Sequence, residues 1–180
     1  MLSEIIKNKM IARFKFYDAN SSGTLEASDY ETMVQRMTSA RNLEPGSEEY
    51  RTLHDKMMNE WEQLQKHADT SSDQKVTLTE WLVYCEHVIA DRAIYDVVVV
   101  GQTNAIFETF AADKDGAVSV DEFIAYYDAY GQDAESARKN FGTINRGAPE
   151  MTKSRLLEIM EEFHFSEDAN APGNFLWGPF

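Results

Sequence analysis

The sequence has few of the residues that covalent or catalytic chemistry requires. It contains one cysteine, Cys85, and four histidines. No internal disulfide can form, and a reducing compartment such as the cytoplasm is expected. Cys85 ends the apolar segment 81–85, which indicates a buried packing role. The histidines show no metal-ligand spacing, and the chain has no glycine-rich phosphate loop and no serine or cysteine motif with a nearby base. These absences argue against an enzyme.

Long hydrophobic runs and positive charge are also scarce. Apolar runs such as residues 97–100 are far shorter than the roughly 20 residues of a membrane-spanning helix. The formal net charge is −14, which repels nucleic acid and anionic membranes and attracts cations. Near the N-terminus, Lys7, Lys9 and Arg13 alternate with apolar residues, which predicts an amphipathic helix too charged for a signal peptide. We expect no nucleic-acid partner and no stable membrane insertion.

Three segments repeat one pattern of oxygen-bearing side chains. The twelve-residue pattern has oxygen ligands at positions 1, 3 and 5, a turn residue at position 6 and a carboxylate at position 12, and the third segment lacks only the ligand at position 1. Hard cations such as Ca²⁺ need about six to eight oxygen ligands, which this spacing supplies from one segment. Apolar residues at helical spacing flank each loop and predict helix–loop–helix units. The loops are residues 18–29 (loop one), 69–80 (loop two) and 111–122 (loop three).

Loop one has a complete ligand set. Gly23 at position 6 supplies the positive φ that the turn demands. Position 12 is Asp29, one methylene shorter than the usual glutamate, which favours the six-coordination that Mg²⁺ prefers. We expect a Ca²⁺ site at which Mg²⁺ competes. The predicted ligands are Asp18, Asn20, Ser22, Thr24 through its carbonyl, and Asp29.

Loop two departs from the pattern at position 6, where Gln74 replaces glycine. A left-handed backbone at a residue other than glycine costs roughly 1–2 kcal/mol, which metal binding can offset. We expect this loop to bind Ca²⁺. The predicted ligands are Asp69, Ser71, Asp73, Lys75 through its carbonyl, and Glu80.

Loop three lacks a ligand at position 1, where Ala111 stands. The alanine removes a charge and a ligand together, so a third site is expected to be weak or empty. Its predicted ligands are Asp113, Asp115, Ala117 through its carbonyl, and Glu122.

A fourth unit is expected because such loops work in pairs. Residues 141–163 supply it, but neither possible register places carboxylates at the ligand positions. One register ends at Arg155 and the other at Leu156, with Met151 or Thr152 at position 8. We therefore predict a degenerate loop that pairs structurally and binds no metal.

The predicted fold is all-α. Four helix–loop–helix (EF-hand) units pack as two lobes, residues 1–92 and 93–165. The apolar residues at position 8, Leu25, Val76 and Val118, suit short two-residue β pairings between loops.

The segment 166–180 ends in an apolar tail with Phe175, Leu176, Trp177 and Phe180. Burial of each side chain contributes roughly 1.5–3 kcal/mol. We expect the tail to pack on the body and to cover apolar surface between the lobes.

Several of these features together are typical of one family. Loop two lacks its glycine, loop one ends in Asp29, the fourth loop is degenerate, and residues 173–180 read GNFLWGPF. On these marks nearly the whole chain resembles the invertebrate sarcoplasmic calcium-binding proteins of the EF-hand superfamily, and within them the calexcitin group. The resemblance implies four units in one compact body with up to three metals.

Three functions stay open. A protein whose apolar surface is covered has little to offer a target helix, which favours an intracellular, monomeric Ca²⁺/Mg²⁺ buffer. The first alternative is a calexcitin-like Ca²⁺ sensor that binds a target protein of unknown identity. The second is a coelenterazine-type carrier or photoprotein relative, because those proteins share the four-unit architecture around a large aromatic cavity.

Overall fold

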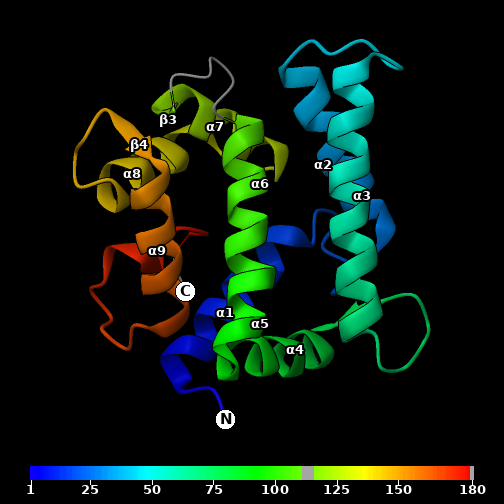
Figure 1. The fold of residues 1–180 in the computed structure, drawn as a ribbon, viewed down its shortest axis with the longest axis vertical. Coiled ribbons are helices and arrows are strands. Elements are labelled where there is room, and N and C mark those ends of the chain that lie inside the picture. The colour runs from blue at the N-terminus through cyan, green and yellow to red at the C-terminus, as the bar shows by residue number, and fades with distance from the viewer. Residues whose placement is uncertain (111–115, 179–180) are drawn as a thin grey trace.

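The computed structural model describes residues 1–110 and 116–178 of the chain (Figure 1). The predicted all-α class is confirmed, since helices joined by loops make up most of the molecule. The helical elements are α1 (Glu4–Tyr17), α2 (Ala27–Ala40), α3 (Glu48–Ala68), α4 (Leu78–Ala90), α5 (Arg92–Tyr95), the π-helical turn η1 (Asp96–Val100), α6 (Gly101–Phe110), α7 (Val120–Ala129), α8 (Ala134–Ile144), α9 (Lys153–Phe165) and the 3-10 turn η2 (Pro172–Phe175).

Two small antiparallel sheets join the loops in pairs. Strand β1 (Thr24–Leu25) pairs with β2 (Val76–Thr77), and β3 (Ala117–Ser119) pairs with β4 (Glu150–Thr152). The register places Leu25 opposite Val76 and Val118 opposite Met151. The predicted pairing through position 8 is therefore confirmed, and Met151 rather than Thr152 takes that position in the fourth loop. The second pairing is three residues long instead of the two that were predicted.

The helices pack around one continuous hydrophobic core. Figure 1 shows α2 and α3 on one side of α6, and α8 and α9 on the other. Helix α1 contacts both α4 and α9, and α2 contacts α7, so the first and second pairs of units touch along several helices. On α1, the ring of Phe16 lies 5.2 Å from that of Tyr127 and 4.4 Å from that of Tyr130. These contacts make the interior between the two pairs a shared aromatic layer.

The chain end packs on α9 and α7. Leu176 and Trp177 are 4% and 7% exposed, and the hydroxyl of Tyr127 donates to the carbonyl of Leu176. A Cβ added at Gly173 would lie 2.6 Å from the carbonyl oxygen of Ile159 in α9, so only glycine permits this approach. Phe175 is partly buried, and Phe180 lies outside the described residues. The last turn of the chain thus closes over α9.

Two basic residues of α1 do not behave as an amphipathic helix predicts. Lys9 is fully buried and Arg13 is 7% exposed. The ammonium of Lys9 donates to the carbonyls of Glu162 and Ser166, at 3.2 and 2.6 Å, and so caps the C-terminal end of α9. Its burial lowers its pKa to about 8. The charge pattern of the N-terminal helix did not reveal the burial of Lys9 and Arg13, because their partners are far away in the sequence.

None of the helices within residues 1–110 and 116–178 has both the length and the apolar character needed to cross a bilayer.

Candidate metal centres

Loop one forms a tight turn, and its first predicted ligand, Asp18, also ends α1. Asp18 is the C-cap of α1, and its two carboxylate oxygens accept from the backbone N–H groups of Ser22 and Gly23, both at 2.9 Å. The side-chain oxygen of Asn20 accepts from the Ser22 N–H at 2.8 Å. Gly23 has φ +85°, as the predicted turn requires. The side-chain oxygens at positions 1 and 3 therefore gather around the same turn.

The last ligand of loop one is held by the helix that follows. Asp29 is fully buried and accepts from the backbone N–H groups of Glu26 at 2.9 Å and Asn20 at 3.3 Å. Glu26 and Asp29 form a reciprocal capping box at the start of α2. Burial raises the pKa of Asp29. Because removing a charged carboxylate from water costs free energy, a bound cation would strongly stabilise the charged form of Asp29.

Loop two is arranged in the same way. Asp69 ends α3, and its carboxylate accepts from the N–H groups of Gln74 at 2.9 Å and Asp73 at 3.3 Å. Gln74 has φ +67°, so it adopts the left-handed conformation that glycine takes in loop one. The strain that the sequence predicted at position 6 is present. It lies directly beside the backbone segment that supplies the ligands.

Glu80 closes loop two and contacts both of its ends. One carboxylate oxygen accepts from the N–H groups of Thr70 and Ser71, and the other accepts from the N–H and hydroxyl of Thr77 at 2.9 Å. The Thr77 backbone N–H is the main cause that lowers the pKa of Glu80 to about 2. This carboxylate stays charged at any physiological pH, as a metal ligand must.

Both loops satisfy their carboxylates with backbone hydrogen bonds. Within the described part of the chain, no three acidic, histidine or cysteine side chains are grouped as a metal-holding cluster. The donors that both loops offer are all oxygens, which suits a hard cation such as Ca²⁺ or Mg²⁺ rather than a softer metal. Metal binding would replace these hydrogen bonds with metal–oxygen contacts, and the ligand assignment stays a prediction.

Loop three is described only in its second half. Gly116 has φ +86°, and Glu122 accepts from the N–H and hydroxyl of Ser119, both at 2.8 Å, in a capping box like that of loop two. Ala117 lies in β3, opposite Thr152. Ala111, Asp113 and Asp115 lie outside the described residues, so the predicted weakness of this site stays a prediction.

The fourth loop is closed by a guanidinium. With Met151 at position 8, Ile144 takes position 1 and Arg155 takes position 12. Arg155 donates from Nε and Nη2 to the carbonyl of Ile144, at 3.0 and 2.6 Å. Asn145 donates to the carbonyls of Ala148 and Glu150 within the same loop. The guanidinium of Arg155 thus joins position 12 of this loop to position 1. The other three loops have a carboxylate at position 12.

The sequence did not indicate that an ion pair joins loops one and two. The ammonium of Lys75, at position 7 of loop two, lies 2.9 Å from the carboxylate of Glu26, at position 9 of loop one. The hydroxyl of Thr24 also donates to this carboxylate at 2.9 Å. The sequence predicted only that the backbone carbonyl of Lys75 binds the cation. The β1–β2 pairing, which brings the two loops together, is the signal that could have revealed its side-chain partner.

Replacing Lys75 with methionine should tighten cation binding at loop one. The change removes a positive charge beside the loop and releases Glu26 to face the cation. Because an exposed ion pair is weak, we expect an increase in affinity of only about two- to fivefold, larger at low than at high salt. Calorimetric titration measures it. Lys139→Met, the same change at an exposed residue of α8, is the matched control. Equal effects of both variants would mean that only net charge matters.

Sequence comparison finds curated relatives over most of the chain. Calerythrin of Saccharopolyspora erythraea is 26% identical over 168 residues, which cover 92% of this chain and 95% of calerythrin. Sarcoplasmic calcium-binding protein 1 of Astacus leptodactylus is 26% identical, with 95% of this chain and 93% of that protein covered. This chain is a relative of the sarcoplasmic calcium-binding proteins. The family resemblance drawn from the loops and the chain end is confirmed. No family model matches the sequence.

Solved structures agree on the fold. A sarcoplasmic calcium-binding protein from amphioxus superposes with a TM-score of 0.73 at 24% identity, and all of both chains is covered. A coelenterazine-binding protein from Renilla muelleri superposes with a TM-score of 0.77 at 21% identity, over 99% of this chain and 100% of that one. At these identities the likeness shows the fold alone. The sarcoplasmic relatives are named for calcium binding and not for an enzymatic activity, which agrees with the prediction that the chain is not an enzyme.

Proposed function

We propose that this chain is a Ca²⁺-binding protein that buffers Ca²⁺ inside the cell, with Mg²⁺ competing at loop one. The observation that carries the proposal is the pairing of loops one and two through β1 and β2, each with a complete set of oxygen ligands. The names of the sarcoplasmic relatives support Ca²⁺ as the ion. The residues that would hold the two ions are Asp18, Asn20, Ser22, Thr24, Asp29, Asp69, Ser71, Asp73, Lys75 and Glu80.

Buffering is favoured over sensing by the buried chain end. A sensor presents an apolar groove to a target when it binds Ca²⁺. Here Leu176 and Trp177 are buried: the Leu176 carbonyl accepts from the hydroxyl of Tyr127 on α7, and the ring of Trp177 lies 4.5 Å from that of Phe163 on α9. A covered surface leaves little for a target to bind, whichever loops are filled.

A sensor remains the second candidate because of one surface groove. A groove of about 820 Å³ runs along α4, α5 and η1 and includes Glu80, the closing ligand of loop two. Val83 and Val97, which line it, are 59% and 77% exposed. Movement of α4 on metal binding would reshape this groove, and a target that binds it only with Ca²⁺ would support sensing.

A coelenterazine-type carrier is less well supported. Two cavities that Arg13 and Tyr17 line have volumes of about 20 and 60 Å³. Both are smaller than the apolar cavity of about 150 Å³ that is known to bind benzene. A large chromophore would therefore require the chain end and several aromatic side chains to move, and that alternative stays a prediction.

Calorimetric titration with Ca²⁺ tests the proposal directly. We expect two tightly bound ions, one of which is lost in Asp18→Asn and the other in Glu80→Gln. A third ion of equal affinity would show that Ala111 does not weaken loop three. No saturable binding would contradict the proposal itself.

Repeating the titration with millimolar Mg²⁺ tests the finer claim about loop one. Mg²⁺ should weaken Ca²⁺ binding in Glu80→Gln, which keeps loop one, more than in Asp18→Asn, which keeps loop two. Asp29→Glu should reduce the competition. Equal competition in both loops would mean that the short carboxylate at position 12 does not set selectivity.

A further inference from the structure

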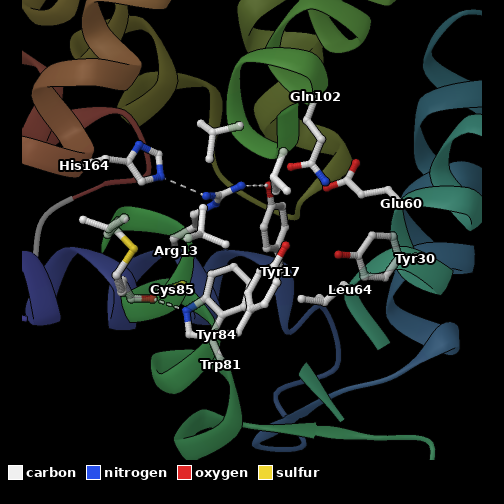
Figure 2. Close-up of a pocket in the computed structure, with 15 residues that line it drawn as sticks. Arg13, Tyr17, Tyr30, Glu60, Leu64, Trp81, Tyr84, Cys85, Gln102 and His164 are labelled. Atoms are coloured by element: carbon white, nitrogen blue, oxygen red, sulfur yellow. Dashed lines mark hydrogen bonds between the residues drawn. The ribbon is translucent and has the colours of Figure 1, made fainter. Parts of the chain in front are cut away.

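The side chain of Arg13 is a buried cation whose hydrogen bonds all go to neutral groups. Its Nη1 lies 3.1 Å from Nε2 of His164, and its Nη2 donates to the hydroxyl of Tyr17 at 3.3 Å. The guanidinium lies 4.7 Å from the ring centre of Trp177 and 5.5 Å from that of Trp81. Figure 2 shows it between His164 and Tyr17, with Tyr17 between Arg13 and Glu60. A buried charge without an anionic partner is costly unless something else pairs with it.

One donor of Arg13 has no acceptor at all in the described protein. Its Nε is buried and without a hydrogen-bond partner, and the same holds for the indole Nε1 of Trp177. Both side chains are 7% exposed. Buried N–H groups are nearly always paired, so two unpaired donors near each other call for an acceptor.

The two unpaired donors belong to residues that line the same cavity. This cavity has a volume of about 60 Å³, and Arg13 and Trp177 form part of its wall. Most of the remaining wall is apolar: Phe107, Val118, Phe123, Met151, Leu156, Met160 and Leu176. A single water needs roughly 10–15 Å³, so the space exceeds that of one water but is smaller than the cavity that benzene fills. Two unpaired N–H donors on residues that line a small, mostly apolar space match a small molecule with an anionic head and a short chain.

We propose that the cavity beside Arg13 binds a small monocarboxylate, with its carboxylate on Arg13 Nε and Trp177 Nε1 and its short alkyl chain against Phe107 and Phe123. The planar guanidinium and carboxylate form strong charge-assisted hydrogen bonds, which a neutral ligand cannot replace. The volume limits the ligand to about the size of formate or acetate.

A route from solvent to this cavity is outlined by shared wall residues. Tyr84 and Val98 line both the exposed groove along α4 and η1 and the smaller cavity of about 20 Å³. Arg13, Tyr17 and Gln102 line both the smaller and the larger cavity. Val98 belongs to the π-helical turn, a type of irregularity that is frequent at functional sites. A small anion could thus pass Tyr84 and Val98 and then reach Arg13.

Nuclear magnetic resonance of the isotopically labelled full-length protein tests the proposal. Titration with sodium acetate should shift the indole N–H signal of Trp177 in a saturable way, while the signal of Trp61 on α3, outside both cavities, should stay in place. Sodium chloride at the same ionic strength and ethanol should not reproduce the shift. Octanoate should bind more weakly than acetate because the cavity is small.

Two variants separate recognition from packing. Trp177→Phe keeps an aromatic ring but removes one donor, and Arg13→Lys keeps the charge but removes Nε. Each should weaken acetate binding about fivefold or more, read from the backbone amides of Thr103 and Phe107. Trp61→Phe is the matched control and should leave the affinity unchanged.

The proposal is overturned if acetate and chloride act alike, if ethanol binds as tightly as acetate, if octanoate binds more tightly, or if neither Trp177→Phe nor Arg13→Lys alters the affinity.

Discussion

Removing residues 174–180 should lower the unfolding temperature by about 10 °C or more. The deletion takes away Leu176 and Trp177, which are buried, and a buried leucine or tryptophan typically contributes about 2–5 kcal/mol through transfer and cavity effects. For a domain of this size, 1 kcal/mol corresponds to roughly 2–4 °C. Total stability is only about 5–15 kcal/mol, so the loss should be plain in a thermal melt.

The same deletion should increase binding of a hydrophobic dye, with or without Ca²⁺. The chain end covers the side chains of α9 and α7, and its loss uncovers them. The full-length protein should bind little dye in either state, which is the behaviour of a buffer. Strong dye binding by the full-length protein only with Ca²⁺, together with an unchanged melt after deletion, would instead indicate a sensor.

Point variants distinguish docking of the chain end from the loss of its side chains. Gly173→Ala keeps every apolar residue but places a methyl group 2.6 Å from the Ile159 carbonyl, so it should undock the end and raise dye binding. Val83→Ala shortens an exposed valine and should change stability by less than about 0.5 kcal/mol. Similar melts for Gly173→Ala and the unmodified protein would mean that the end is not packed against α9 in solution.

The sequence predicted those features that depend on short, fixed spacings. Position 8 of the first three loops could be located because it lies a set number of residues after position 1, and the pairing of Leu25 with Val76 followed, whereas the partner of Val118 was left open between Met151 and Thr152 until the structure gave Met151. The need for a left-handed residue at Gln74 was visible for the same reason. Local geometry alone decides these features, so no knowledge of the rest of the chain was required.

Features that depend on distant partners could not be predicted. Lys9 and Arg13 have the spacing of a charged helix face, yet each binds groups near the other end of the chain, at Ser166 and His164. The ion pair of Lys75 with Glu26 forms only because β1 and β2 pair in this register. The hydrogen bonds from Arg155 to the Ile144 carbonyl likewise depend on the register of β3 with β4. Burial overrides the charge pattern only where tertiary packing supplies acceptors, which a single sequence does not show.

The titrations of His164 and Glu60 should change the free energy of unfolding in opposite directions as the pH falls. Burial, with a further contribution from the Arg13 charge, lowers the pKa of His164 to about 3. Its Nδ1 donates to the Met160 carbonyl at 2.7 Å, so the neutral ring accepts from Arg13 through Nε2. Lys9 and Arg13 are the charged groups that oppose its protonation. Burial raises the pKa of Glu60, on α3, to about 7, against a smaller opposing effect of Arg13.

The signs follow from which state binds the proton first. Below pH 6.5 the unfolded chain protonates His164 while the folded chain does not until about pH 3, so this group removes stability as the pH falls. Glu60 takes up its proton near pH 7 in the folded state but only near pH 4.5 in the unfolded chain, so this group adds stability over that interval. Each contributes at most about 1.4 kcal/mol per pH unit. In the unmodified protein the two largely cancel between pH 6.5 and 4.5.

Single substitutions should separate the two contributions. His164→Gln, whose amide oxygen can still accept from Arg13, should become about 2 kcal/mol more stable, relative to the unmodified protein, between pH 6.5 and pH 5. Glu60→Gln should become less stable by a similar amount over the same interval. Denaturant unfolding at each pH measures both, and every other titrating group is common to the three proteins. His54→Gln, at an exposed histidine, is the control. If His164→Gln and Glu60→Gln shift the profile in the same direction, one of the two groups does not titrate in the buried environment beside Arg13.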